Sequence, residues 1–359
     1  MTGRGVSDPV LSVPPVRIPG GTGAEGAIVP RTVHPAQRRV QLSAEGIAAL
    51  TAAAGRATGL PTTGARLLKF TNNAVVLLPR AGAVLRIAGS NEVRARVPVV
   101  VAAARWLQGL GLPAVRLHPQ APNPLAIGGH LVTVWQAVQT AAAPATASGL
   151  AEILRVLHAV GAPPPPDLPD WNVVAAIRRR LGEADGVAEG DLAFLREELA
   201  AVEAMVAALQ EVEPLVPSGV VHGDAFLGNV IASPGGPVIC DFDGVSVGPR
   251  EWDLVPVAVG ALRFDYGTGL QAEFARAYGV DVTAWPGFPA LRRVRELQLV
   301  TSVLPVLEAN PALRPQWRVR LETLRRRDSS VRWTPYPAAD HWPADHRSAD
   351  HGPAGEGRA

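Results

Sequence analysis

Apolar residues recur at three- and four-residue spacing between Ser43 and Thr58. This spacing predicts a helix with Ser43 as its N-cap, and Gly59 marks its end. The pattern then changes to short apolar segments, rich in β-branched residues and separated by polar turns, which predict strands at 65–70, 74–79 and 83–88. We therefore expect a helix followed by a three-stranded antiparallel meander.

Helical spacing dominates the rest of the chain. One helix is expected at about 98–110, and short strands are expected at 114–117 and 130–135. Apolar stripes predict further helices that begin near Ser148, span 191–211, follow Arg292 and follow Leu313. These stripes are typical of buried helix faces.

A strong turn signal stands in the middle of the chain. Ser233-Pro234-Gly235-Gly236-Pro237 separates two short apolar segments and predicts a hairpin. Asp224 follows an earlier apolar strand, Asn229 comes just before the hairpin, and Asp241 comes just after it. The hairpin is thus expected to bring these three oxygen-bearing side chains together.

The three residue types suit magnesium-dependent phosphoryl transfer. A hydroxyl that attacks a phosphate needs a carboxylate to orient it and accept its proton, which is the role expected for Asp224. Mg²⁺ prefers oxygen ligands, and an amide from Asn229 and a carboxylate from Asp241 meet that preference. Polar loop residues that merely cap turns are the competing interpretation, but it does not explain the spacing of the whole set.

Composition excludes several classes of protein. With 359 residues and 47% hydrophobic content the chain can bury a large core, and its net charge of +2 gives no reason to expect a nucleic-acid partner. Cys240 is the single cysteine and Lys69 the single lysine. Neither a signal peptide nor a membrane helix is expected, so we predict a cytoplasmic protein. Residues 1–40 and 331–359 are expected to be a disordered leader and tail.

His222-Gly223-Asp224, with Asn229 five residues after the aspartate and Asp241 twelve further, resembles the aminoglycoside phosphotransferase and choline kinase family, relatives of the protein kinases. The resemblance implies an α+β, protein-kinase-like bilobal fold. A small N-lobe with an antiparallel sheet would span 41–138 and a larger, mainly helical C-lobe 139–330.

The resemblance also implies roles for neighbouring residues. His222 joins Asp224 in the catalytic set, as a residue that holds the geometry of the loop. Asp243 joins Asn229 and Asp241 as a metal ligand. Asp253 resembles the family's aspartate that braces the catalytic loop from a following helix.

ATP would lie against the N-lobe sheet. The turn with Asn72 and Asn73 would approach its phosphates, and Arg86 stands where the family has a phosphate-binding lysine. An exposed strand arginine is the alternative for Arg86. The helix expected at 98–110 contains no acid to orient it. Gln136 and Val138 would form the hinge beside adenine.

The expected function is transfer of the ATP γ-phosphate to a hydroxyl of a small molecule, such as an aminoglycoside antibiotic or a related metabolite. Polycationic acceptors need a lining of carboxylates, and the C-terminal helices are richer in arginine, which leaves Glu251, Asp265 and Asp281 as the acidic candidates. An aromatic content of 5% gives little support for a choline-binding box. The sequence leaves the acceptor and the oligomeric state open.

Three other interpretations stay open. A pseudokinase that binds or regulates without turnover fits Arg86, the plain first turn and the absent helix acid. A glycosyltransferase fits Asp241-Phe242-Asp243 but leaves Asp224 and Asn229 unexplained. A protein kinase would need a peptide groove, of which the sequence gives no sign.

Overall fold

The predicted helix and meander are confirmed. The computed structural model describes residues 42–70, 73–264, 266–267 and 269–336. Helix α1 spans Ala44–Thr58; Ser43 Oγ accepts the Gly46 N–H at 3.0 Å, and Gly59 ends the helix in the left-handed conformation with φ 73°. Strands β1 (Arg66–Phe70), β2 (Asn73–Leu78) and β3 (Ala83–Ala88) follow as an antiparallel meander.

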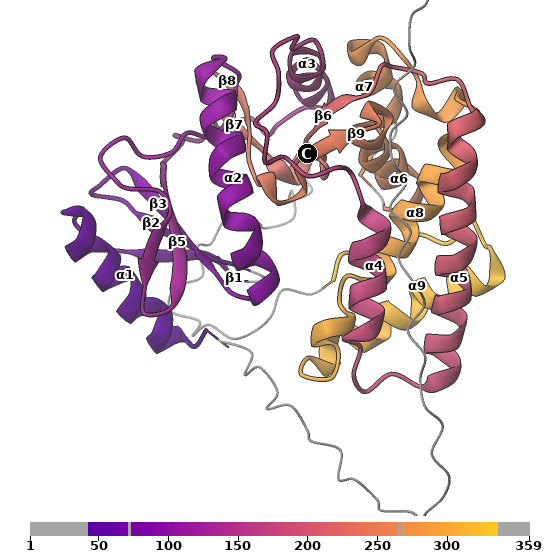
Figure 1. Ribbon diagram of the computed structural model, residues 1–359, viewed down its shortest axis with the longest axis horizontal. Helices are drawn as coiled ribbons and strands as arrows, with labels where there is room; N and C mark the ends of the chain where they lie inside the picture. Colours follow the sequence, from indigo (N-terminus) through magenta and orange to yellow (C-terminus); the bar gives the residue numbers. More distant parts are fainter. Residues whose placement is uncertain (1–41, 71–72, 265, 268, 337–359) are drawn as a thin grey trace, which may run out of the picture. The chain divides into compact units, whose positions relative to one another are not determined.

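The meander belongs to a five-stranded antiparallel sheet with the order β1-β2-β3-β5-β4 (Figure 1). Strand β5 (His130–Gln136) was predicted, whereas β4 (Leu125–Ile127) was not. The strand expected at 114–117 is wrong, because Ala114 and Leu117 make only isolated bridges, to Ile239 and Trp135.

The two faces of the sheet have different roles. Leu85 and Ile87 of β3 are fully buried in a core shared with α1. Since side chains alternate along a strand, Arg86 between them points to the opposite face. Helix α2 (Asn91–Gly109) packs against β3 and β5 and contacts the segment 242–244 of the C-terminal region.

Helix α2 begins seven residues before the predicted start at Pro98. Ser90 caps it by accepting the Val93 N–H, and an apolar face that includes Val93 and Val97 is buried. The cap and the buried face together outweigh the hydrogen bond that Pro98 cannot donate within the helix. Glu92 therefore lies in its first turn.

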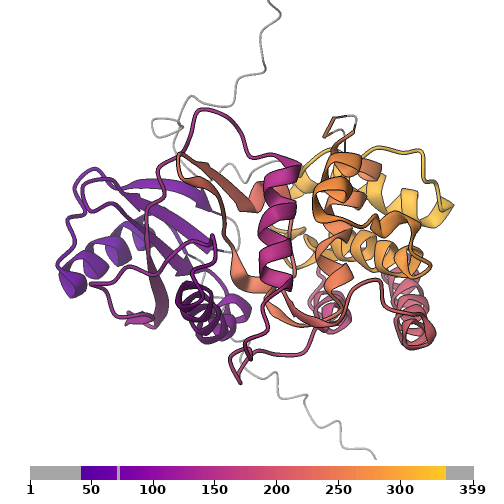
Figure 2. The same ribbon diagram turned by 90° about the horizontal axis from the view of Figure 1, so that it is seen from above.

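The C-terminal region is mainly helical, as Figures 1 and 2 show. Its helices are α3 (Ala147–His158), α4 (Val173–Gly182), α5 (Glu189–Ala208), α6 (Val255–Arg263), α7 (Leu270–Tyr278), α8 (Phe288–Thr301) and α9 (Arg314–Arg326). It also contains two antiparallel strand pairs: β6 (Gly219–Val221) with β9 (Ser246–Gly248), and the hairpin of β7 (Val230–Ser233) with β8 (Gly236–Ile239). Short 3₁₀ segments include η2 (Leu227–Asn229), η3 (Phe242–Gly244) and η4 (Arg250–Asp253). The α+β fold class is thus confirmed.

The leader expected at 1–40 and most of the tail expected at 331–359 lie outside the described residues. The first residues of that tail are described, and they include the buried Trp333, whose indole N–H donates to Thr323 Oγ1 at 3.2 Å. In the described part of the chain, no helix combines the length and the apolar character needed to cross a bilayer.

Candidate active site

Residues 222–229 follow strand β6 and are called the catalytic loop after the candidate base Asp224 that they contain. The Asp253 side chain holds the start of this loop. This carboxylate is fully buried; its Oδ2 accepts the His222 N–H at 2.6 Å and its Oδ1 accepts the Gly223 N–H at 2.7 Å. His158 Nε2 lies 3.2 Å from Oδ2. The brace that the sequence predicts for Asp253 is present.

Gly223 lets the catalytic loop touch the segment that carries the candidate metal ligands. Its φ is 85°, and a Cβ there would lie 2.1 Å from the Gly244 carbonyl oxygen. Any side chain at 223 would collide with backbone as well as adopt a strained conformation. Glycine at this position is therefore required for the close approach of residues 222–229 and 240–244.

His222 is buried, and both ring nitrogens contact backbone. Nε2 lies 3.0 Å from the Cys240 carbonyl oxygen, and the Asp224 N–H points to Nδ1 at 3.4 Å. The ring packs edge-on against Phe242 with centroids 5.8 Å apart. These contacts support a role in fixing loop geometry and give the ring no free nitrogen for proton transfer.

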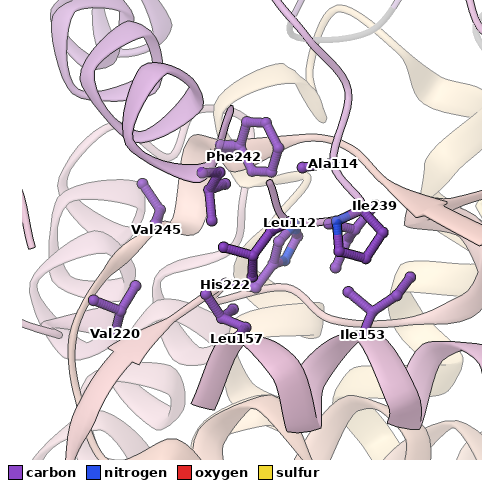
Figure 3. A pocket seen from close by; sticks show the side chains of 11 residues that line it. Leu112, Ala114, Ile153, Leu157, Val220, His222, Ile239, Phe242 and Val245 are labelled. Atoms are coloured by element: carbon purple, nitrogen blue, oxygen red, sulfur yellow. The ribbon is translucent and has the colours of Figure 1, made fainter. Parts of the chain in front are cut away.

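An apolar pocket lies behind the catalytic loop (Figure 3). His222, Phe242 and Val245 line one part of it, and Leu157 and Ile153 of α3 line another. Burial also raises the pKa of the nearby Cys240 thiol to about 11, so the thiol is neutral near pH 7. We take this pocket as packing space that positions the two loops.

Asp224 is held from two sides. Asn229 Nδ2 donates to the Asp224 carbonyl oxygen at 2.9 Å and lies 3.4 Å from Oδ2. Arg295 of α8 donates through Nη2 to Asp224 Oδ1 at 2.7 Å, and this arginine is only 8% exposed. The structure therefore brings Asp224 and Asn229 together as predicted, and adds an arginine that sequence reasoning missed.

Asp241 and Asp243 lie at the end of strand β8. Asp241 is in the left-handed conformation with φ 70°, which directs the chain into η3. Burial raises the pKa of Asp241; the negative charge of Asp243 raises it further, and the positive charges of Arg86 and Lys69 lower it. A cation in this position would offset the repulsion between these two neighbouring, partly exposed carboxylates.

The donor set fits a hard cation. The buried oxygens Asp241 Oδ1, Asp243 Oδ1 and Asn73 Oδ1 have no hydrogen-bond partner among the described residues. Asn229 uses its amide nitrogen on Asp224, so its amide oxygen is not engaged by that contact. No group of three His, Cys, Asp or Glu side chains suited to a metal occurs in the described segments, so a mixed set of carboxylate and amide oxygens is the candidate.

Arg86 crosses from the sheet to these carboxylates. Its Nη2 forms an ion pair with Asp243 and lies 3.5 Å from Asp241 Oδ1, while Asn73 Nδ2 lies 3.4 Å from Asp243 Oδ2. The exposed-arginine alternative is wrong, because the Arg86 side chain is 12% exposed. Lys69 of β1 and Arg86 both align with Val75 of β2, which places two cations in one row of the sheet.

Helix α2 contains an acid, Glu92, but this acid does not pair with Arg86 of the sheet. Glu92, now inside α2, forms an ion pair with Arg179 of α4 and not with Arg86. Arg96 of the same helix donates to the Asp243 carbonyl oxygen at 2.9 Å and to the Val245 carbonyl oxygen at 2.8 Å. Helix α2 is thus connected through Arg96 to the segment that carries the candidate metal ligands.

The remaining nucleotide residues receive less support. Asn72 lies outside the described residues. Gln136 ends β5, and its side chain donates to the Leu117 carbonyl oxygen at 3.2 Å; Val138 follows in the connection to α3. Neither residue contacts the Asp241 region among the interactions of the described chain, so their part in adenine binding stays a prediction.

The two acidic candidates that the structure describes, Glu251 and Asp281, both accept backbone hydrogen bonds. Glu251 is 1% exposed and accepts the Leu215 and Val216 N–H groups at 2.6 and 3.0 Å. Asp281 accepts the Thr283 N–H at 2.9 Å as a cap. Asp265 lies outside the described residues.

Replacing Asp253 with asparagine is expected to lower the free energy of unfolding by about 2–3 kcal/mol, because an amide turns one N–H donor toward a buried backbone donor. Urea denaturation measures this loss. The control is Asp167→Asn, since Asp167 is exposed. Equal stability of the two variants would show that Asp253 does not hold the loop.

The fold is a kinase-like α+β fold, and Asp224, Asn229 and Asp241 lie in two adjoining segments, 222–229 and 240–244. Residues 64–297 match the model of the phosphotransferase enzyme family, and the chain belongs to that family. No curated protein sequence matches the chain.

Solved structures give the same fold. A choline/ethanolamine kinase family protein from Mesorhizobium loti is 20% identical, with 78% of this chain and 92% of that chain covered and a TM-score of 0.53. An amicoumacin kinase in complex with AMP-PNP, Ca²⁺ and its ligand is 12% identical, with 80% and 95% covered and a TM-score of 0.58. A microcompartment-associated aminopropanol kinase is 16% identical, with 80% and 100% covered and a TM-score of 0.56.

Proposed function

We propose that the protein transfers the γ-phosphate of ATP to a hydroxyl group of a small molecule. The observation that carries this proposal is that Asn229 contacts Asp224 through its side chain and the Cys240 N–H, next to Asp241, through its carbonyl oxygen. Arg86 of the sheet pairs with Asp241 and Asp243. The family match supports phosphoryl transfer, and several of the structurally similar proteins are small-molecule kinases.

Asp224 would orient the acceptor hydroxyl and take its proton as the oxygen attacks phosphorus. Its Oδ1 is engaged by Arg295, and the Asn229 amide lies 3.4 Å from Oδ2. These contacts fix the carboxylate, so that one position of the acceptor hydroxyl is favoured over others.

Asn229, Asp241 and Asp243 would hold Mg²⁺, and Arg86 and Asn73 would bind phosphate oxygens with Asn72. When bound, Mg²⁺ neutralises charge on the phosphates. Arg86 pairs with both aspartates in this structure. Its positive charge offsets the repulsion between the two carboxylates and keeps them close together. Gln136 and Val138 would lie beside adenine.

The neighbours' names include amine-bearing acceptors and antibiotics, so an antibiotic-modifying enzyme of the cytoplasm is one form of the proposal. A pseudokinase is the second candidate, favoured by the ion pair that Arg86 makes with Asp243. The glycosyltransferase alternative has no support from the family match, and Phe242 between the two aspartates is buried.

An ATP-consumption screen tests the proposal. The purified chain with Mg-ATP is offered aminoglycosides, other hydroxylated antibiotics, amino alcohols, sugars and sugar acids, and ADP formation is recorded. Acceptor-dependent ADP formation that disappears in Asp224→Asn is the expected result. Tight Mg-ATP binding without turnover on any acceptor would instead favour the pseudokinase.

A further inference from the structure

Arg180, on the last turn of α4, carries a buried guanidinium group with no ion pair or hydrogen bond among the residues that the structure describes. Its Nη1 is buried and has no hydrogen-bond partner among the described residues. Helix α4 packs against α8, which carries Arg295 (Figure 1). A buried guanidinium N–H that lacks an acceptor is costly, so this group is suited to a ligand that supplies one.

The charges around Arg180 can be identified one by one. Burial lowers the pKa of Arg180; Glu92 raises it, Arg179 and Arg295 lower it, and Asp224 raises it. All four groups are therefore within electrostatic reach. Glu92 is paired with Arg179, and Asp224 is paired with Arg295.

One positive charge remains after these pairs are matched, and it belongs to Arg180. We propose that Arg180, on the helix that packs against the Arg295-bearing α8, binds an anionic group, a carboxylate or a phosphate, of the hydroxylated acceptor. This inference rests on the proposed function, because it places the acceptor hydroxyl at Asp224.

The chemistry of the guanidinium supports an anion. Its planar N–H groups match the oxygens of a carboxylate or phosphate and can bind them bidentately. A polycationic acceptor would meet the unmatched charge of Arg180 and would find Glu251 committed to backbone N–H groups. We therefore expect an acceptor with an anionic group, in contrast to the amine-bearing acceptors of some structural neighbours.

Matched acceptors provide the kinetic test. Glycerol, D-glycerate, glycerol 3-phosphate and 3-amino-1,2-propanediol share one diol and differ in charge; sorbitol, gluconate and glucamine repeat the comparison on a six-carbon chain. We expect kcat/KM for at least one anionic member to exceed that of its neutral and cationic counterparts by about 10- to 100-fold, the range for a hydrogen bond to a charged group. The glycerate and glycerol 3-phosphate arms distinguish a carboxylate from a phosphate.

Three variants show whether Arg180 is responsible. Arg180→Met removes the charge from a similar unbranched chain, and Arg180→Lys keeps it. Arg178→Met is the control, because Arg178 lies on the same helix with a 62% exposed side chain paired to Glu203. Arg180→Met is expected to raise KM for the anionic acceptor about 10- to 100-fold without changing KM for ATP. Arg180→Lys should recover part of the loss, and Arg178→Met should behave as wild type.

A binding measurement separates this inference from the proposed function. Thermal unfolding is followed with sodium sulfate and with sodium chloride of equal ionic strength, in the presence of Mg-AMP-PNP. Stabilisation by sulfate that is lost in Arg180→Met and kept in Arg178→Met supports the anion site even if no acceptor is turned over. Equal sulfate stabilisation of both variants, or turnover that favours the neutral or cationic acceptors, overturns it; the second result leaves the phosphotransferase proposal intact.

Discussion

Replacing Asp224 with asparagine is expected to lower kcat by about 10²- to 10⁴-fold while the Kd of Mg-ATP stays within about threefold of wild type. Asparagine keeps the size of the side chain and an oxygen for Arg295, which donates to Asp224 Oδ1 at 2.7 Å. It cannot accept the acceptor proton. Alanine at 224 should abolish turnover as well, but it would also leave the mostly buried Arg295 without its ion pair.

Steady-state kinetics on the best acceptor and calorimetric titration with Mg-ATP provide the two values. Asp167→Asn, an exposed carboxylate, is the control for nonspecific effects. A variant at 224 that loses turnover and nucleotide binding together would contradict the assignment of Asp224 as a base.

Replacing Asp241 with asparagine is expected to weaken Mg-ATP binding about 100-fold or more, because a charged metal ligand becomes neutral. Asparagine is the suitable substitution, since it tolerates the left-handed backbone that Asp241 adopts at φ 70° and alanine does not. Calorimetry with Mg-ATP measures the effect. Unchanged affinity would exclude Asp241 from the metal site.

The same variant gives a test by pH. The pKa of Asp241 is raised in the folded protein, chiefly by burial and also by Asp243. The folded state thus binds this proton more tightly than the unfolded state does, and its stabilising contribution is lost as the pH rises through the folded pKa. In metal-free buffer, the free energy of unfolding of Asp241→Asn relative to wild type should therefore increase with pH between the unfolded-state pKa and the folded-state pKa of Asp241. A difference that is constant with pH would contradict the raised pKa.

Local patterns were sufficient for much of the fold. Helix α1 and the β1–β3 meander follow from apolar spacing, one N-cap and polar turns, all of which act over a few residues. Helix α2 starts earlier than predicted. Pro98 is typical of a first helical turn, but the helix begins at Asn91 with Ser90 as its cap. Strand β4 has only three residues and depends on pairing with β5, so its own sequence carries little signal.

The site could be predicted only in part for a related reason. Asp224, Asn229 and Asp241 lie within a short stretch whose hairpin fixes their proximity. Arg295 reaches Asp224 from α8, 71 residues later, and no spacing rule connects them. Arg180 comes from α4 and becomes notable only when the ion pairs around it are known.

Glu251 is the converse case, a residue that the sequence offers as an acceptor contact and that the structure places elsewhere. As an acid near the catalytic segment it was a candidate for contacting a cationic acceptor, yet it is buried and bonded to two backbone N–H groups. A sequence gives the identity of a charge but not the direction in which it points. The backbone hydrogen bonds of Glu251 and the ion pair of Arg86 with Asp243 show that direction in the structure.

The central claim is that Asp241, Asp243 and Asn229 gather around a magnesium ion that carries ATP, next to Arg86. Calorimetric titration of the wild-type chain with ATP, once in excess Mg²⁺ and once in EDTA, tests it most directly. We predict saturable one-to-one binding in Mg²⁺ that is at least about tenfold weaker in EDTA. Absence of binding in Mg²⁺, or the same affinity in both buffers, would contradict the account.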